Sequence, residues 1–435
     1  MNITQINITK SLQVKFSKFI NKHSCNLKKP SVKFIKEITN GIIKSQSCIV
    51  RQIAQDLSET ISLKKTQERL TYQLDNETEL EKIRENMLLQ SCRKLKKESL
   101  IIIDPSDIIK PNATKMEGLS RVRDGNDGIY KAGYDVIDIV GVNQTSSQTS
   151  IFPIHSDIHS NKIGLDTLKN KIFNRILDII IFSSNAGIFV MDRGFDDKKV
   201  IEELYKLGAA FIIRMKINRS VFYKGFLMNI KEVANQTKKK YTFNIDSKTS
   251  IKAGVSEVGI PLSRHKVKNP AQAKSLLVSA IITTKHKNGR VSKGAFMLLV
   301  SLPNSAYSDK EICKLALESY RLRWKIEEVH RQVKTDFGWE KIQVLKFNRI
   351  RALNTLLWLT LSFIYEFDDW KYKFAKAFSS LMLDKKNDLK ILEKFIYYRI
   401  TKVIKYCFSQ TRLYRKKTMF QRRKCCDQIP LPFYL

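Results

Sequence analysis

The stretch GIFVMDRGFDDKKVIEELYKLGAAFIIRMK, residues 187–216, changes twice between strand-like and helix-like sequence. Its apolar beginning, GIFVMDRGFD, predicts a strand, and its end, AAFIIRMK, predicts another. The segment DKKVIEELYKL between them is typical of a helix, and Gly208 follows it as expected of a residue just past a helix C-terminus. Two strands joined by a helix indicate a βαβ unit, so we expect an α/β fold.

The segments before this unit extend the pattern. Three more strands are predicted at Leu100–Ile103, GYDVIDIVGV (133–142) and TSIFPIHS (149–156). A helix is then predicted in LDTLKNKIFNRILDIIIF, where Leu168, Ile172 and Ile176 have helical spacing. Three strands followed by helix, strand, helix and strand predict a ribonuclease-H-like core, in which right-handed βαβ crossovers extend three antiparallel strands.

The rest of the chain surrounds and interrupts this core. We predict the following divisions: a helical N-terminal DNA-binding region at 1–98, the first part of the catalytic core at 99–216, a β-rich insertion at 217–294, the second part of the core at 295–345, and a helical, basic C-terminal region at 346–435. The insertion is predicted from extended, Lys- and Thr-rich segments such as KKKYTFNI. The motifs RLYRKK and QRRK near the C-terminus could either dimerise or contact DNA.

Two short segments of the N-terminal region, IVRQIAQDLSE and LKKTQERLTYQL, are separated by Thr60–Ser62. This arrangement predicts a helix-turn-helix. Its second helix could present a DNA-reading surface made of Lys64, Lys65, Gln67, Arg69 and Tyr72. The alternative is a small helical bundle with a solvated basic face.

Charge and composition narrow the class of partner. The 435 residues include 78 Lys and Arg against 42 Asp and Glu, a formal net charge of +36, which indicates a polyanionic partner. Nucleic acid is favoured over a membrane surface, because the basic residues are spread along the chain rather than confined to one tail. The apolar stretch Leu353–Phe367 is too short to span a bilayer and is expected to be a buried helix. Seven scattered cysteines indicate neither a disulfide framework nor a zinc site, which fits a reducing cytoplasm.

Two aspartates stand at predicted strand ends. Asp104 follows Leu100–Ile103 and Asp192 follows the strand that begins the 187–216 stretch. Reactive groups gather at the carboxyl ends of strands in open α/β sheets. A turn-forming or helix-capping role is the alternative for either residue alone. Asp107 is the rival of Asp104 as the functional aspartate of this segment, and Asp104 is preferred because it directly ends the strand.

The segment YRLRWKIEEVHRQVK supplies a third acid. In it Tyr320, Arg323, Glu327 and Lys334 share one face of a predicted helix, and apolar residues occupy the opposite face. One carboxylate would then lie among donors suited to phosphate. The alternative is a solvated amphipathic helix with ion pairs between successive turns.

The spacing Tyr-x2-Arg-x3-Glu-x6-Lys is that of the YREK signature, so the chain resembles transposases of the insertion-sequence-four family. IDPSD around Asp104 and MDRGFD around Asp192 are similar to that family's two aspartate motifs, and the resemblance covers roughly residues 45 to 370. It implies a DDE transposase that cuts the ends of a mobile DNA element and joins them to target DNA. Asp104, Asp192 and Glu327 would be catalytic and would hold two Mg²⁺ ions, for which Mn²⁺ can substitute.

The resemblance also implies DNA contacts and partners. Tyr320, Arg323 and Lys334 would bind phosphates near the cleaved end, with help from Arg193. The partners would be double-stranded DNA and a second copy of the chain, in the cytoplasm of a bacterium and associated with its nucleoid. Some members of the family form a DNA hairpin and stack a flipped base on a Trp of the insertion. The insertion of this chain contains no Trp, so Phe222, Tyr223, Tyr241 or Phe296 would have to stack the base instead.

Two other functions remain open from the sequence. The chain could be a DNA-binding remnant that acts as a repressor, or a ribonuclease-H-like nuclease without strand transfer.

Three histidines are further candidates for functional residues. His155 and His159 are four residues apart, but they are predicted in a strand and a following loop, which disfavours a metal site. His330 is expected to lie at the surface on the flank of the Glu327 helix.

Overall fold

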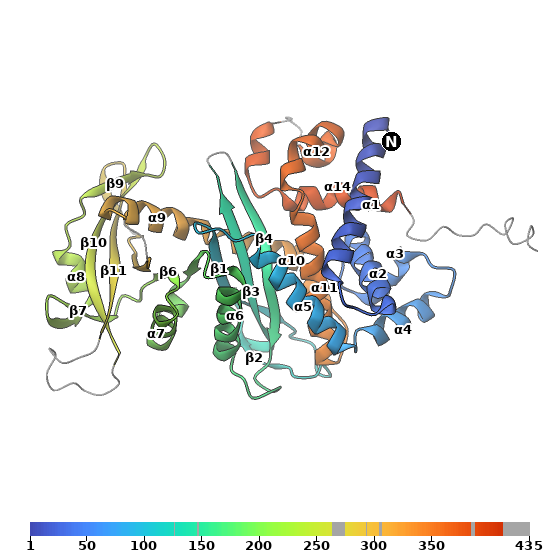
Figure 1. Cartoon of the computed structure of the whole chain (residues 1–435), viewed down its shortest axis with the longest axis horizontal. Helices are drawn as coiled ribbons and strands as arrows, with labels where there is room; N and C mark the ends of the chain where they lie inside the picture. The colour runs from blue at the N-terminus through green and yellow to red at the C-terminus, as the bar shows by residue number, and fades with distance from the viewer. Residues whose placement is uncertain are drawn as a thin grey trace, which may run out of the picture.

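The computed structural model describes residues 1–125, 127–145, 148–262, 275–292, 294–303, 307–383 and 388–411, and Figure 1 labels its elements. The motifs RLYRKK and QRRK lie outside these residues, so their role stays a prediction.

The centre of the fold is the part of the sheet with strand order β4-β3-β1-β5-β6. Its strands are β1 (Leu100–Ile109), β3 (Tyr130–Gln144), β4 (Thr149–His159), β5 (Ile188–Met191) and β6 (Ala210–Arg214), and β2 (Ser120–Arg123) pairs with the beginning of β3. Strand β3 is antiparallel to β1 and β4, whereas β5 is parallel to β1 and β6. Helix α6 (Leu168–Ser183) precedes β5, and η1 (Arg193–Phe195) and α7 (Lys198–Lys206) connect β5 to β6. The predicted ribonuclease-H-like α/β fold is confirmed.

The two faces of β1 belong to different hydrophobic clusters. Leu100 and Ile102 pack in the cluster that includes Ile326 and Val329 of α10 (Lys325–Thr335). Ile101 and Ile103 pack in the cluster formed with α6 and α7. Because side chains alternate along a strand, Asp104 continues the face of Leu100 and Ile102, toward α10.

Strand β1 is longer than the sequence predicted. It continues past Asp104 to Ile109, still paired with β3, so Asp104 lies inside the strand rather than at its end. The pairing with β5 does stop at Ile103, which is opposite Met191. The next residue but one is Pro105, which has no backbone N–H to donate to a strand on this side of β1.

The insertion continues the same sheet. β13 (Met297–Ser301) pairs with both β6 and β11 (Ser275–Lys287), and the order continues through β10 (Thr249–Pro261), β7 (Ser220–Tyr223) and β8 (Phe226–Asn229). Smaller elements of this part are β9 (Tyr241–Asn244), β12 (Arg290–Ser292) and α8 (Ile230–Gln236). Figure 1 shows this part projecting to one side of the core, with α9 (Asp309–Leu322) between them. Thirteen strands of the described residues thus form one sheet.

Helices from both ends of the chain pack together on the other side of the core (Figure 1). The N-terminal ones are α1 (Ile3–His23), α2 (Lys29–Ser45), α3 (Val50–Leu57), α4 (Leu63–Gln73) and α5 (Glu77–Cys92). The C-terminal ones are η3 (Trp339–Lys341), α11 (Phe347–Tyr365), η4 (Asp368–Trp370), α12 (Lys371–Ala377), α13 (Ser379–Met382), η5 (Leu389–Glu393) and α14 (Tyr397–Ser409). The buried helix expected at Leu353–Phe367 corresponds to α11, which is buried along most of its length. No helix among the described residues is long and apolar enough to cross a membrane.

The predicted helix-turn-helix segments are α3 and α4. Helix α4 buries only Thr66 and Leu70, and it exposes Lys64 and Lys65. Arg69 differs from these lysines, because its guanidinium lies 2.6 Å from a carboxylate oxygen of Glu37 and 2.8 Å from one of Glu59. Arg69 therefore connects helices of the bundle in this structure.

A buried ion pair fastens α11 to the core. Arg351 contacts both carboxylate oxygens of Asp157 on β4, at 2.9 and 3.1 Å. Its other terminal nitrogen lies 3.1 Å from Glu77 of α5. Asp157 is 9% exposed, and the arginine charges lower its pKa although burial alone would raise it. The Arg351 guanidinium thus joins α11 to β4 and to α5.

Strand β4 also contains the two spaced histidines. It extends through His159, so no loop begins after Ser156, and both His155 and His159 are buried. Burial lowers the pKa of His155 well below its usual range. His159 contacts Asn161 Oδ1 at 2.9 Å. Neither histidine belongs to the cluster of candidate metal ligands among the described residues.

Candidate active site

The strand registers bring three aspartates to one region of the sheet. Ile103 is opposite Met191 on parallel strands, and the next residue of each strand is Asp104 or Asp192. Asp104 is also directly opposite Asp138 on antiparallel β3. Because directly opposed residues point to the same face, Asp138 shares the face of Asp104. Asp138 could not be predicted from the sequence, because nothing in its strand distinguishes it from Asp135 or other polar positions.

The segment that carries Glu327 is two helices rather than one. Helix α9 ends at Leu322 and α10 begins at Lys325. Between them, Arg323 N bonds to Tyr320 O, and Ile326 N bonds to Arg323 O, each across three residues and at 3.2 Å. These tighter turns interrupt the ordinary α-helical ladder. The prediction of a single continuous helix face was therefore wrong, because this local change in hydrogen bonding cannot be recognised from apolar spacing.

The break leaves Arg323 between two acids. Its Nη1 lies 3.0 Å from Asp104 Oδ2, and its Nη2 lies 3.2 Å from Glu327 Oε1. Burial raises the pKa of Asp104 to about 6, and the charges of Glu327 and Asp192 add to this effect while Arg323 and His330 oppose it. A carboxyl group whose charge is this costly is one that a bound cation would stabilise.

His330 lies in the same cluster, which corrects the expectation of a surface position. It is one turn after Glu327 on α10, and its side chain is 11% exposed. Its Nε2 lies 3.0 Å from Asp138 Oδ2. Burial opposes a charge on the ring, but Asp138, with smaller effects from Asp104 and Glu327, raises the pKa of His330 overall. The sequence did indicate that His330 lies near Glu327, because the two are three residues apart and residues at this spacing are neighbours on one face of a helix.

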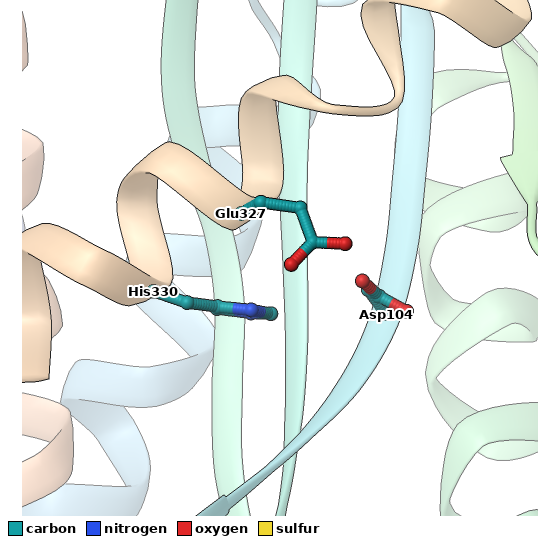
Figure 2. A group of neighbouring side chains, drawn as sticks. All are labelled: Asp104, Glu327 and His330. Atoms are coloured by element: carbon teal, nitrogen blue, oxygen red, sulfur yellow. The ribbon is translucent and has the colours of Figure 1, made fainter. Parts of the chain in front are cut away.

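Asp104, Glu327 and His330 form the one candidate metal-binding group found among the described residues. Each can offer a ligand atom, and these atoms lie within 4.8 Å of one another. Figure 2 shows the Glu327 carboxylate and the His330 ring on successive turns of α10, both extending toward Asp104 on β1. Asp192 is not a member of this group, although its charge reaches Asp104. Carboxylate oxygens fit Mg²⁺ or Mn²⁺, so the donors suit a divalent cation.

The rival aspartate has a different partner. Asp107 Oδ1 lies 2.7 Å from Lys334 Nζ, and its Oδ2 accepts from Gly125 N at 2.9 Å. Lys334 also lies 3.3 Å from Glu340. The structure therefore separates the predicted set: Arg323 and Glu327 meet Asp104, while Lys334 meets Asp107.

Tyr320 and Arg323 also line a cavity of about 700 Å³ between α9 and the insertion. Its wall contains the aromatic rings of Phe243, Phe296 and Trp324, and Trp324 is 63% exposed. The ring centroids of Phe296 and Tyr320 are 5.6 Å apart. Basic side chains complete the wall: Arg214, Lys285, Lys314 and Arg321. Of the aromatic residues considered for base stacking, Phe296 lines this cavity, whereas Phe222, Tyr223 and Tyr241 are not among its lining residues.

A family model matches the part of the chain that forms this sheet and carries these acids. Residues 96–363 match the family model described as transposase DDE domain, which spans more than half of the chain. The chain belongs to the transposase DDE domain family. The match covers the whole of the segment from β1 through α10, and so includes Asp104, Asp192 and Glu327.

Two further comparisons add less. This transposase-family chain is similar to a piggyBac transposase solved by cryo-electron microscopy in a synaptic complex with hairpin DNA, with 10% sequence identity and a TM-score of 0.41. The similarity covers 99% of this chain and 87% of that one. No curated protein matches the sequence.

Proposed function

We propose that this chain is a DNA transposase that uses divalent metal ions to cut the ends of a mobile element and to join them to target DNA. The supporting observation is the convergence on one face of the sheet: the β1–β5 register aligns Asp104 with Asp192, and Glu327 reaches Asp104 from α10. Membership of the transposase DDE domain family supports the same function. The YREK spacing favours the insertion-sequence-four branch of such enzymes.

In this proposal Asp104, Asp192 and Glu327 hold two Mg²⁺ ions, with Mn²⁺ as a substitute. Bound there, the metal would lower the cost of activating a hydroxyl nucleophile and of releasing the leaving oxygen at phosphorus. The sheet keeps Asp104 and Asp192 at fixed positions, and packing of α10 against it fixes Glu327. Rigid placement of these three carboxylates matters, because small misplacements at a metal site reduce the rate strongly.

The neighbouring basic side chains would bind DNA. Arg323 would grip a phosphate beside the acids, which a guanidinium can do in bidentate fashion. Tyr320 shares the cavity wall with Arg323, and Arg193 is exposed directly after Asp192, so both could contact the same strand. Lys334 would act about two turns beyond Glu327 on α10, after exchanging Asp107 for a phosphate. The net charge of +36 supports long contacts with DNA.

The partners are proposed on the same basis. Two ends of an element must be cut together, so a homodimer that bridges both ends is expected. Double-stranded DNA is its substrate and the bacterial cytoplasm, beside the nucleoid, is its place of action. The divisions at residues 98, 216, 294 and 345 remain part of this proposal, with 1–98 as the DNA-binding region.

A cleavage and joining assay tests the proposal. The substrate is DNA with the element's own flanking repeats, and the reactions contain Mg²⁺ or a chelator. We expect Glu327→Gln to reduce both reactions at least about 100-fold, the size seen when one electrostatic group is removed from an active site, while DNA binding is retained. The matched control is Glu328→Gln on the same helix, whose carboxylate pairs with Lys325 at 2.9 Å.

The outcomes also separate the two alternatives. A parent protein that binds the repeats but never cuts them is a repressor. Cleavage without joining indicates a nuclease. Equal activity of the parent and Glu327→Gln rejects the proposed site.

A further inference from the structure

The acids of this site stand beside an imidazole that the proposed mechanism does not use. His330 is on α10, three residues after Glu327, and its ring extends toward the same region as the Glu327 and Asp104 carboxylates (Figure 2). One ring nitrogen lies within 4.8 Å of an oxygen of each acid. A nitrogen at this distance from two carboxylates is close enough to share a cation with them.

A further acid, Asp138, contacts the ring. Asp138 is 5% exposed, and its Oδ2 lies 3.0 Å from His330 Nε2. Its Oδ1 is buried and accepts no hydrogen bond from any described residue. A histidine that binds a metal usually contacts a carboxylate through its other ring nitrogen. The carboxylate fixes the orientation of the ring and makes the metal-binding nitrogen more basic.

We propose that His330 is a protein ligand of the cation held by Asp104 and Glu327, and that Asp138 is the positioning residue that orients its ring. This inference rests on the proposed function and adds a nitrogen ligand to one of its two divalent ions. The imidazole would make this position more favourable to the substitute ion Mn²⁺ than a site of oxygen ligands alone, because Mg²⁺ is bound almost entirely through oxygen.

The local charges support a cation at this point. Asp104, Glu327 and Asp138 surround the ring and Arg323 lies between the first two. Arg323 is the cation that faces Asp104 and Glu327 in this structure, and a divalent ion would take over this role.

Pulsed electron paramagnetic resonance of bound Mn²⁺ tests the ligand directly. The full chain is prepared with ¹⁵N-labelled histidine and loaded with Mn²⁺ alone, and a second sample also contains duplex DNA. We expect a hyperfine coupling to ¹⁵N in at least one sample, and its loss in His330→Gln. The control is His286→Gln, because His286 lies on β11 of the insertion.

The Asp138 part has its own measurement. Asp138→Asn should keep the ¹⁵N coupling but weaken Mn²⁺ binding about 10- to 100-fold, as expected when the carboxylate that orients a metal-binding histidine is lost. Unchanged Mn²⁺ affinity in this variant overturns the positioning role.

Bound Mn²⁺ without any ¹⁵N coupling overturns the ligand proposal, as does a coupling that survives His330→Gln or an absence of Mn²⁺ binding in both samples. The absence of a coupling in the wild-type spectrum is decisive even if a variant does not fold. Failure of the proposed function is a different result, namely a nitrogen-coupled Mn²⁺ site in a protein that never cuts DNA.

Discussion

Arg323 Nη1 lies 3.0 Å from Asp104 Oδ2, although 219 residues separate them in the chain. The guanidinium also contacts Glu327. A cation of the protein itself thus neutralises the two acids to which the proposed metal ion would bind. Arg323 would have to exchange these carboxylates for a DNA phosphate when the metal enters.

This contact leads to a prediction about metal affinity. Arg323→Gln should tighten Mn²⁺ binding to the DNA-free protein about fivefold, because removing a competing ion pair is worth ~1 kcal/mol. Cleavage should fall nevertheless, since the proposed phosphate contact is lost. Titration of Mn²⁺ by electron paramagnetic resonance measures the affinity, with Arg323→Lys as the control that keeps the charge. Weaker binding in Arg323→Gln would contradict the competition.

The stability of the junction between the core and the helices can be tested on α11. Arg351→Met should lower the free energy of unfolding by about 3 kcal/mol or more, because it leaves Asp157 buried without its counter-ion. Arg349→Met on the same helix is the matched control. It breaks the bidentate pair with Asp75, whose side chain is 33% exposed, and should cost less than about 1 kcal/mol. Chemical denaturation compares the two, and equal losses would argue against the buried pair as the stronger contact.

His23 should make stability depend on pH. Burial lowers its pKa to about 4, and its Nδ1 lies 2.9 Å from Phe19 O. Its pKa in the unfolded chain is about 6.5, so the unfolded state binds more protons between these values. The contribution is therefore complete above pH ~6.5 and is lost as the pH falls toward 4, by up to about 3 kcal/mol. Urea denaturation at several pH values should show a smaller loss in His23→Gln and an unchanged loss in His286→Gln.

A fourth prediction concerns close packing in the core. A Cβ added to Gly141 on β3 would lie 2.2 Å from the Phe152 ring on β4. Gly141→Ala should therefore destabilise the protein by roughly 1–3 kcal/mol, the usual cost of overpacking. The second substitution Phe152→Leu should restore part of this loss. If Gly141→Ala has the same thermal midpoint as the parent, the sheet accommodates the methyl group and the prediction fails.

Much of the fold followed from local sequence. The apolar runs and the helix between β5 and β6 are local features, and their order left few topologies open, because crossovers are right-handed. The spacing of Asp104, Asp192 and Glu327 within the chain was also visible. Asp104 and Asp192 each follow an apolar run predicted as a strand, and the carboxyl ends of such strands meet at one edge of a sheet.

The tertiary structure decided what those residues touch. The break between α9 and α10 sets Arg323 against Asp104 and directs Lys334 to Asp107. The β1–β3 register places Asp138 opposite Asp104, and packing of α10 turns His330 inward. Sequence periodicity states which residues share a face. It cannot give the register between distant strands or the burial of a particular polar group, because both depend on contacts that form only when the chain has folded.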